Sequence, residues 1–225
     1  GFMWQKLSRR SEKYGLQAEV TSFVTISGDM EVEYVEITNI SDKDVEVVPI
    51  GVIPVYGRSA DNLRDHRHVT SLLHRIQTTE YGVEVKPVLS FDERGHQKNN
   101  TTYFVYGSSE NGEKPESFYP TVEDFIGEGG TFLNPEAVRT NKPGKTAGTK
   151  IQGKEAVGGL RFSRKTLKPK EAAGYILLSG TTKTSDSIAL LTSGCKTKLQ
   201  VQKMLEEVKE HWIQKVNVAF ETGNS

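Results

Sequence analysis

The densest cluster of side chains capable of chemistry is the run DNLRDHRH at residues 61–68, and His74 follows it. Neutral imidazoles two residues apart share one face of a strand and can bind a metal ion together. No cysteine and no HExxH helix accompany this histidine pair, so the pattern favours no metal site. A polar loop with arginine–carboxylate pairs, or a surface whose donors face a sugar or another domain, fits better. The secondary candidate residues are the basic side chains of this run: Arg64, His66, Arg67 and His68.

A second group of candidates combines carboxylates and glycines at residues 123–136. Cleavage of a glycosidic bond needs two carboxyl groups, or one carboxyl acid with an external nucleophile. Spacing alone pairs none of the carboxylates here, and we expect most of them to be solvated. The run GEGGT at residues 127–131 lacks the Lys-Ser/Thr of a phosphate loop, so it predicts a tight turn, although its glycines also permit close approach of a ligand or partner chain. The candidates for a substrate-cleft or interface loop are Glu123, Asp124, Gly127, Glu128, Gly129, Gly130, Thr131 and Asn134.

The remaining motifs add no catalytic residue. Cys195 precedes a predicted helix, where a thiolate would be favoured, but no base stands beside it in the sequence, so we expect a packed thiol. No GxSxG nucleophile elbow is present. We therefore assign neither a catalytic residue nor a metal ligand to this chain.

Composition excludes several classes of protein. The 225 residues contain 29 Lys and Arg and 29 Asp and Glu, so the formal net charge is zero and no nucleic-acid or anionic-membrane partner is indicated. No apolar stretch is long enough to span a bilayer. One cysteine cannot form an internal disulfide, and the first residues contain no signal peptide. We expect a cytoplasmic protein.

The elements that must position the candidate residues are mostly strands. Alternation and strand-forming residues predict strands at residues 18–26, 32–38, 45–56, 69–78, 83–91, 102–108, 159–163 and 172–179. The Asn/Ser/Asp cluster at residues 39–44 predicts a β-hairpin between the second and third of these strands. Many strands separated by turn signals predict an antiparallel sandwich. The polar, glycine-rich residues 134–154 predict one long loop.

One amphipathic helix is predicted at residues 196–216. Its apolar positions fall on one face, and Thr197 with Gln200 forms a potential capping box. Such a stripe must pack on the sheet or on a domain outside this chain. The chain has no initiator Met and ends shortly after this helix, so we expect a piece of a longer protein.

Four stretches, taken in order, resemble glycoside hydrolase family 94. Residues 35–42 resemble the Thr-Asn-x-Ser-Asp hairpin of that family's amino-terminal domain, and residues 124–138 resemble its Phe-Ile/Leu-Gly … Asn-Pro-x-Ala-Val/Leu segment. Residues 156–171 are similar to its late strand pair, and the helix with Trp212 is similar to its linker helix. Residues 62–75 look most like the β-1,2-oligoglucan phosphorylase branch. One departure is Val122, which stands where family members often carry an arginine, so no arginine contact to sugar is carried over.

The resemblance implies a fold and a parent reaction. The fold is mainly β: a large antiparallel super-sandwich of mutarotase-like type over residues 1–192, followed by a C-terminal linker helix over residues 193–225. The reaction is inverting phosphorolysis of a β-glucan oligosaccharide, with inorganic phosphate as co-substrate and no cofactor. The catalytic acid would belong to an (α/α)6 barrel that this chain does not contain. The sandwich would pack on that barrel, support a homodimer and extend loops toward the substrate cleft.

Two alternatives remain open from the residues alone. A freestanding carbohydrate-binding sandwich would present aromatic faces to sugars, but the alternation of these aromatic residues in strands also suits a core, and we favour the core for them. The side chains in question are Tyr103, Tyr106, Phe118 and Tyr119. A mutarotase-like enzyme would need a histidine and a glutamate that converge in one cleft, with the base supplied by His66, His68 or His74.

Overall fold

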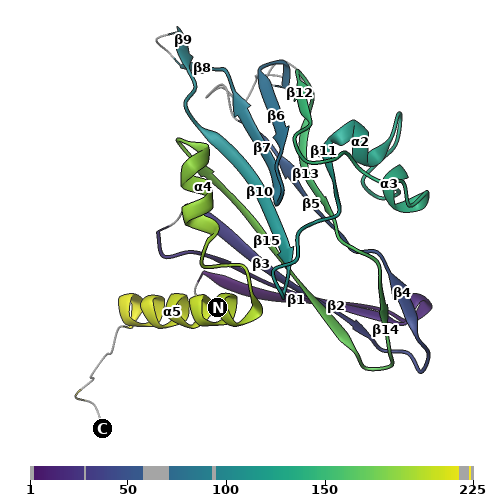
Figure 1. Cartoon of the computed structure of the whole chain (residues 1–225). Helices are drawn as coiled ribbons and strands as arrows, with labels where there is room; N and C mark the ends of the chain where they lie inside the picture. Colours follow the sequence, from purple (N-terminus) through teal and green to yellow (C-terminus); the bar gives the residue numbers. More distant parts are fainter. Residues whose placement is uncertain (1–2, 28, 58–70, 93–94, 218–222, 224–225) are drawn as a thin grey trace.

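The computed structural model describes residues 3–27, 29–57, 71–92, 95–217 and 223. Its largest element is an eight-stranded antiparallel sheet with the order β1-β2-β3-β15-β10-β7-β6-β12 (Figure 1). The strands in that order are β1 (Trp4–Ser11), β2 (Leu16–Val24), β3 (Met30–Asn39), β15 (Ala172–Thr182), β10 (Thr102–Ser109), β7 (Gly82–Pro87), β6 (His74–Thr78) and β12 (Lys150–Gln152).

A smaller antiparallel sheet faces part of this large sheet and has the order β11-β13-β5. Its strands are β11 (Ser117–Thr121), β13 (Ala156–Arg161) and β5 (Ile50–Val55). Two strand pairs extend the sandwich: β4 (Val45–Val47) with β14 (Lys165–Leu167), and β8 (Leu89–Asp92) with β9 (Gly95–Lys98). The helices are η1 (Glu12–Tyr14), α2 (Val122–Ile126), α3 (Glu136–Arg139), α4 (Ser185–Thr192) and α5 (Lys198–Val216).

Residue alternation gives the large sheet two hydrophobic faces. One face packs on the small sheet through a cluster that contains Val105 and Leu177. The other face packs under α4 and α5 through a cluster that contains Ile176, with Ile188 and Val208 from the helices. A third cluster joins α2 and α3 to the outer face of the small sheet. The predicted mainly β super-sandwich is confirmed.

Gly158 shows how closely the two sheets approach. A Cβ atom at this position of β13 would lie 2.2 Å from Cβ of Val105 on β10, a separation that real Cβ atoms essentially never show. The residue must therefore be glycine for the sheets to keep their spacing.

The predicted hairpin between residues 32–38 and 45–56 is wrong. β3 pairs with β2 and β15, whereas β4 pairs with β14 and β5 pairs with β13. The turn itself is present, because the Asn39 Oδ1 atom accepts hydrogen bonds from the backbone N–H and the hydroxyl of Ser41. The Asn39 amide also donates to the carbonyl oxygen of Leu167 at 2.8 Å. This bond ties the turn to β14, so the chain leaves the large sheet here.

Other boundaries differ from the prediction. The strand expected at residues 83–91 is divided into β7 and β8, and the strand expected at residues 69–78 begins at His74, with residues 69–70 outside the described part. The long loop expected at residues 134–154 contains α3 and β12. Several short elements were not predicted: β1, β9, β11, β14, α2 and α4.

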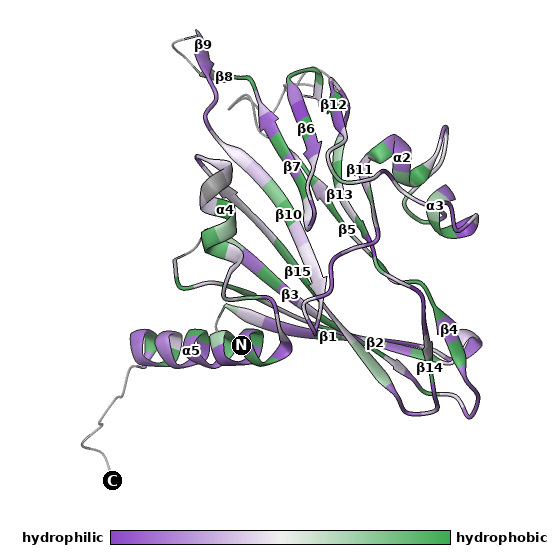
Figure 2. Cartoon of the chain, viewed as in Figure 1, coloured by the Kyte–Doolittle hydropathy of each residue, from purple (hydrophilic) through white to green (hydrophobic). Residues whose placement is uncertain are grey.

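The predicted C-terminal helix is confirmed as α5. Thr197 is its N-cap, and the capping box with Gln200 forms in both directions. Hydrophilic and hydrophobic residues alternate along this helix (Figure 2), and its stripe buries Val201 and Val208 against the large sheet. Val216, the last residue of the stripe, is exposed. Within the described residues, no helix combines the length and the apolar character that a membrane span needs.

Candidate functional site

The predicted loop begins at α2, on the outer side of the small sheet. Thr121 ends β11 and caps α2, because its Oγ1 atom accepts a hydrogen bond from the Asp124 N–H at 3.0 Å. Phe125 is the one buried residue of this short helix, and its ring packs edge-on against Tyr119. The capped turn and this anchor hold α2 in place, so the polar residues of α2 face outward.

These polar residues border a hollow of about 420 Å³ that we call the lysine hollow. Its lining comes from α2, from the loop that follows, and from the later segment that the sequence predicted as one long loop. The lining residues are Thr121, Glu123, Asp124, Gly127, Glu128, Glu136, Lys142, Lys145, Ile151 and Lys154.

Most charges of the lysine hollow are paired with each other. The Lys154 ammonium lies 2.7 Å from Glu123, and the Lys145 ammonium lies 3.5 Å from Asp124. The Lys154 ammonium lowers the pKa of the Glu123 carboxyl, and Glu123 in turn raises the pKa of Lys154. The arrangement offers alternating donors and acceptors at its surface, which suits hydrogen bonding to a hydroxylated ligand or to a polar partner surface.

The loop glycines are explained by backbone geometry. Gly127 and Gly129 have positive φ angles of +80° and +67°. A Cβ atom at Gly130 would lie 1.9 Å from the carbonyl oxygen of Ile126. All three glycines are thus required by the turn, as the tight-turn interpretation predicts.

The structure brings together half of the predicted loop residues. Glu123, Asp124, Gly127 and Glu128 line the lysine hollow. The other predicted residues lie in the connection between α2 and α3 and do not line it: Gly129, Gly130, Thr131 and Asn134. Sequence reasoning did not assign the three lysines or Glu136 to this site. The one available signal was that all four stand in the polar stretch at residues 134–154, where the three lysines are opposite in charge to the carboxylate run.

The second predicted cluster lies outside the described residues. Its members are Arg64, His66, Arg67 and His68. His74 is described and is buried, with its two ring nitrogens each 3.2 Å from a backbone carbonyl oxygen, those of Lys154 and Gly57. It is a core histidine. Among the described residues, no group of three side chains gathers as metal ligands.

The four aromatic candidates have different positions. Phe118 and Tyr119 are almost fully buried, and the Tyr119 hydroxyl donates to the carbonyl oxygen of Lys142. The Tyr106 hydroxyl donates to Glu84 at 2.7 Å. Phe118 and Tyr119 are therefore core residues, as favoured from the sequence, and the hydroxyl group of Tyr106 is held by the fold. Tyr103 is half-buried and lines a second hollow.

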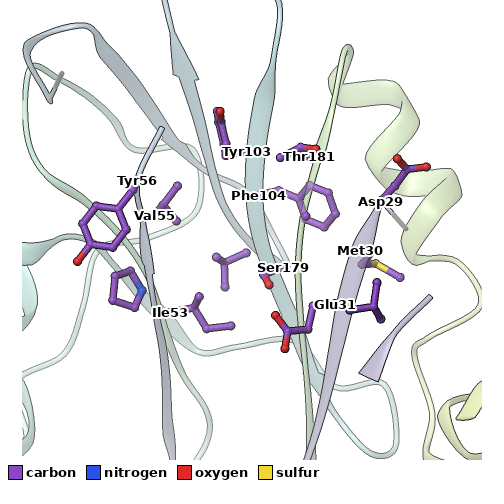
Figure 3. A pocket seen from close by; sticks show the side chains of 14 residues that line it. Asp29, Met30, Glu31, Ile53, Val55, Tyr56, Tyr103, Phe104, Ser179 and Thr181 are labelled. Atoms are coloured by element: carbon purple, nitrogen blue, oxygen red, sulfur yellow. The ribbon is translucent and has the colours of Figure 1, made fainter. Parts of the chain in front are cut away.

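This second hollow, the sheet hollow, measures about 350 Å³ and lies where β5 meets the large sheet. Tyr56 stands on one side, and Asp29 and Glu31 stand on the other (Figure 3). The lining residues are Val24, Asp29, Met30, Glu31, Ile53, Pro54, Val55, Tyr56, Tyr103, Phe104, Val105, Ser179, Gly180 and Thr181.

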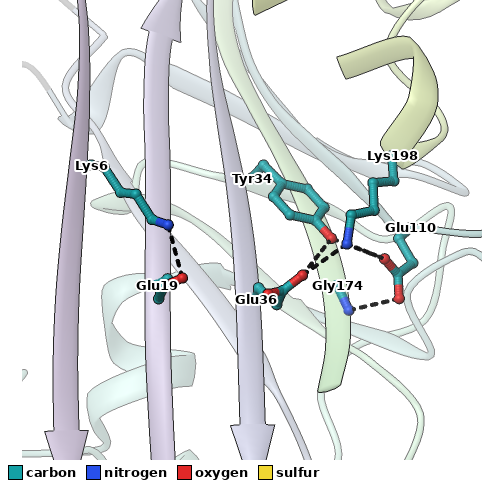
Figure 4. Close-up of polar contacts among 7 residues, drawn as sticks. All are labelled: Lys6, Glu19, Tyr34, Glu36, Glu110, Gly174 and Lys198. Carbon is teal, nitrogen blue, oxygen red and sulfur yellow. Dashed lines mark hydrogen bonds and ion pairs between the residues drawn. The ribbon is translucent and has the colours of Figure 1, made fainter. Parts of the chain in front are cut away.

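A polar network fastens α5 to the helix-covered face of the large sheet (Figure 4). The Lys198 ammonium lies 2.8 Å from Glu36 and 3.8 Å from Glu110. The Tyr34 hydroxyl donates to Glu110 at 2.9 Å, and the other Glu110 oxygen accepts from the Gly174 N–H at 3.1 Å. Lys198 lowers the pKa of the Glu36 carboxyl, and burial is the largest cause of the raised pKa of Tyr34. Because its charges are satisfied internally, this network is an anchor for the helix.

Comparison with known proteins agrees with this fold. The family described as glycosyl hydrolase 94, supersandwich domain, matches residues 2–210. A bacterial glucoamylase complexed with acarbose aligns over 94% of this chain and 26% of its own, with 9% identity and a TM-score of 0.55. A putative kojibiose phosphorylase from human microbiome aligns over 96% of this chain and 21% of its own, with 9% identity and a TM-score of 0.39. The likeness to the glucoamylase shows a shared fold alone, and the likeness to the kojibiose phosphorylase carries no argument. No curated protein sequence matches at a significant level.

Proposed function

We propose that this chain, which belongs to the glycosyl hydrolase 94 supersandwich family, is the non-catalytic β-sandwich domain of an inverting oligosaccharide phosphorylase. The family match over residues 2–210 is the observation on which the proposal rests. The chain spans about a quarter or less of the solved chains reported above, so the activity of a longer protein is part of the proposal.

The chemistry is assigned to a domain outside this chain. In the proposal, a carboxyl acid of an (α/α)6 barrel protonates the leaving oxygen of a β-glucan, and inorganic phosphate attacks the glucosyl carbon as co-substrate. The charges of the lysine hollow support a non-catalytic role for the chain itself. Because Lys154 lowers the pKa of Glu123, this carboxyl group stays ionised at neutral pH and is a poor proton donor.

The connection between α2 and α3 is proposed to contact the barrel or the partner subunit of a cytoplasmic homodimer, and to shape the substrate cleft. Three apolar side chains support this role because they are exposed beside the lysine hollow: Phe132, Leu133 and Val138. Leu133 is 98% exposed, which is an arrangement expected of an interface residue.

The first test uses the chain as it is. Incubation of the 225-residue protein with a β-1,2-linked glucan oligosaccharide and phosphate should release no sugar 1-phosphate. Release of sugar 1-phosphate by the pure chain would contradict the non-catalytic assignment.

The second test uses the full-length enzyme that the proposal assigns. Leu133→Ser should lower kcat/KM for phosphorolysis about tenfold, because a buried leucine contact contributes about 1.5 kcal/mol. Leu199→Ser on α5 is the matched control, since Leu199 is also an exposed leucine, at 75%, and lies away from the loop. Equal kinetics for both variants would argue against a role for the loop.

A further inference from the structure

The sheet hollow contains an uncommon combination of surfaces. Its floor comes from three adjacent strands of the large sheet, where Glu31, Ser179 and Val105 are cross-strand neighbours and Thr181 pairs with Tyr103. Its wall is β5, the edge strand of the small sheet, which carries Pro54. An aromatic and aliphatic wall therefore stands beside a hydroxyl- and carboxylate-bearing floor.

The polar groups of the hollow are not used by the fold. Within the described residues, the side chains of Asp29 and Glu31 form no ion pair or hydrogen bond, and the same holds for the hydroxyl groups of Tyr56 and Tyr103. Tyr56 is 65% exposed although its ring borders the hollow. Asp29 and Glu31 are exposed, so their carboxylate oxygens and the open ring of Tyr56 can exchange water for a ligand without breaking a contact within the fold.

The charge of the hollow restricts the ligand class. The described residues that line it include two carboxylates and no lysine, arginine or histidine. A phosphate, a sugar phosphate or another anion would be repelled. Burial and the neighbouring Glu31 charge raise the pKa of Glu33 on the same strand, which is consistent with a negative local field.

We infer that the sheet hollow binds an uncharged saccharide. A sugar ring presents an apolar C–H face that can stack on Tyr56, and its hydroxyl groups can donate to Glu31 and exchange hydrogen bonds with Ser179 and Thr181. The volume, about 350 Å³, falls at the lower end of the roughly 300–1,000 Å³ of small-molecule sites, which suits a mono- or disaccharide unit. This site goes beyond the proposed cleft-shaping role and stands on different residues.

The inference is tested by titrating the 225-residue chain with a neutral β-linked glucose trisaccharide. Binding is observed by calorimetry and by amide chemical shifts. We expect saturable binding that does not change with salt concentration. Tyr56→Ala and Glu31→Gln should each weaken binding about fivefold or more, because the first removes the stacked ring and the second replaces a charged acceptor by a weaker neutral one. Both side chains are exposed, so thermal melts should confirm that the variants remain folded.

The chain supplies matched controls. Tyr14→Ala removes a tyrosine that is 62% exposed in η1 and does not line the sheet hollow, and it should leave binding unchanged. Lys145→Ala tests the lysine hollow in the same titration. The inference is overturned by absence of saturable binding, by stronger binding of glucose 1-phosphate, or by loss of binding in Lys145→Ala with Tyr56→Ala unaffected. None of these outcomes bears on whether the α2–α3 connection serves a phosphorylase cleft, which the Leu133 variant tests separately.

Discussion

The sheet hollow and the lysine hollow are similar in volume and opposite in the state of their charges. The lysine hollow lies beside α2 and α3 on the outer side of the small sheet, and two of its three lysines pair with its own carboxylates. The sheet hollow opens along β5 on the inner side, and its carboxylates pair with no described side chain. Paired charges are already satisfied and mainly shape a surface, whereas unpaired acceptors in a concave site are available to a ligand. This difference is why we propose contact with a neighbouring domain for the first region and recognition of a small molecule for the second.

The largest expected effect is a loss of stability that disrupts the lysine hollow and leaves the sheet hollow intact. Phe125→Ala removes the only buried side chain of α2 and should cost about 3–4 kcal/mol of unfolding free energy. The lysine hollow should be disrupted, because α2 supplies Glu123 and Asp124, which pair with its lysines. Saccharide binding to the sheet hollow should persist in the folded fraction. Urea unfolding and the titration described above measure both quantities, and a parallel loss of binding in fully folded protein would show that the two regions are coupled.

A smaller effect is expected where the sheets touch. Gly158→Ala places a methyl group against Val105, which lines the sheet hollow, and should cost about 1–3 kcal/mol through overpacking. The same change should move β5 and weaken saccharide binding. Gly194→Ala is the control, because its nearest contact would be the Cε atom of Met204 at an ordinary 3.8 Å. If Gly158→Ala melts at the wild-type temperature, the sheets are not in the tight contact described here.

The smallest effect concerns two glutamates on opposite faces of β3. Lys198 lowers the pKa of Glu36, so this carboxylate stabilises the fold above its unfolded pKa and the contribution is lost as the pH falls through its folded pKa. Burial and Glu31 raise the pKa of Glu33, so ionised Glu33 destabilises the fold, and the protein gains stability as the pH falls from neutral toward its unfolded pKa.

Variants at these two positions should therefore shift stability in opposite directions. At pH 7, Glu36→Gln should lower the unfolding free energy, and Glu33→Gln should raise it, each by a few tenths to about 1 kcal/mol after solvent screening. The Glu33 difference should vanish below about pH 4, where that carboxyl group is protonated in the folded and the unfolded state, whereas the Glu36 difference should shrink but persist until the pH falls below the lowered folded pKa of Glu36. Denaturant unfolding at pH 7 and pH 3.5 measures them. Shifts of the same sign would mean that Glu33 does not experience the acidic field on the sheet-hollow side.

The sequence was informative where structure is local. The strand alternation and the Thr197–Gln200 capping box predicted β strands and α5 because both patterns depend on neighbouring residues. Strand pairing was not predictable in the same way. The turn after Asn39 has the composition of a hairpin, but its amide bonds to Leu167, which is 128 residues away in the chain.

The same limit applies to the two hollows. Three carboxylates of the lysine hollow lie close together in the sequence and were identified: Glu123, Asp124 and Glu128. Lys145 and Lys154 reach them only through the fold. The sheet hollow brings together Glu31 of β3, Ser179 of β15 and Tyr56, which follows β5, so no spacing rule indicates it. The buried Tyr119 and the accessible Tyr103 both occur in strands between two layers, where alternation gives no sign of which ring is exposed.

The position of Cys195 gives the molecule an internal reporter. It is the only cysteine of the chain, it is 1% exposed, and its sulfur lies 3.5 Å from the sulfur of Met204 on α5. Burial raises the pKa of its thiol to about 11, so the reactive thiolate is scarce while α5 remains in place. The rate at which a thiol reagent modifies the native protein therefore measures how often α4 and α5 separate from the large sheet. No label has to be introduced, and no competing thiol has to be subtracted.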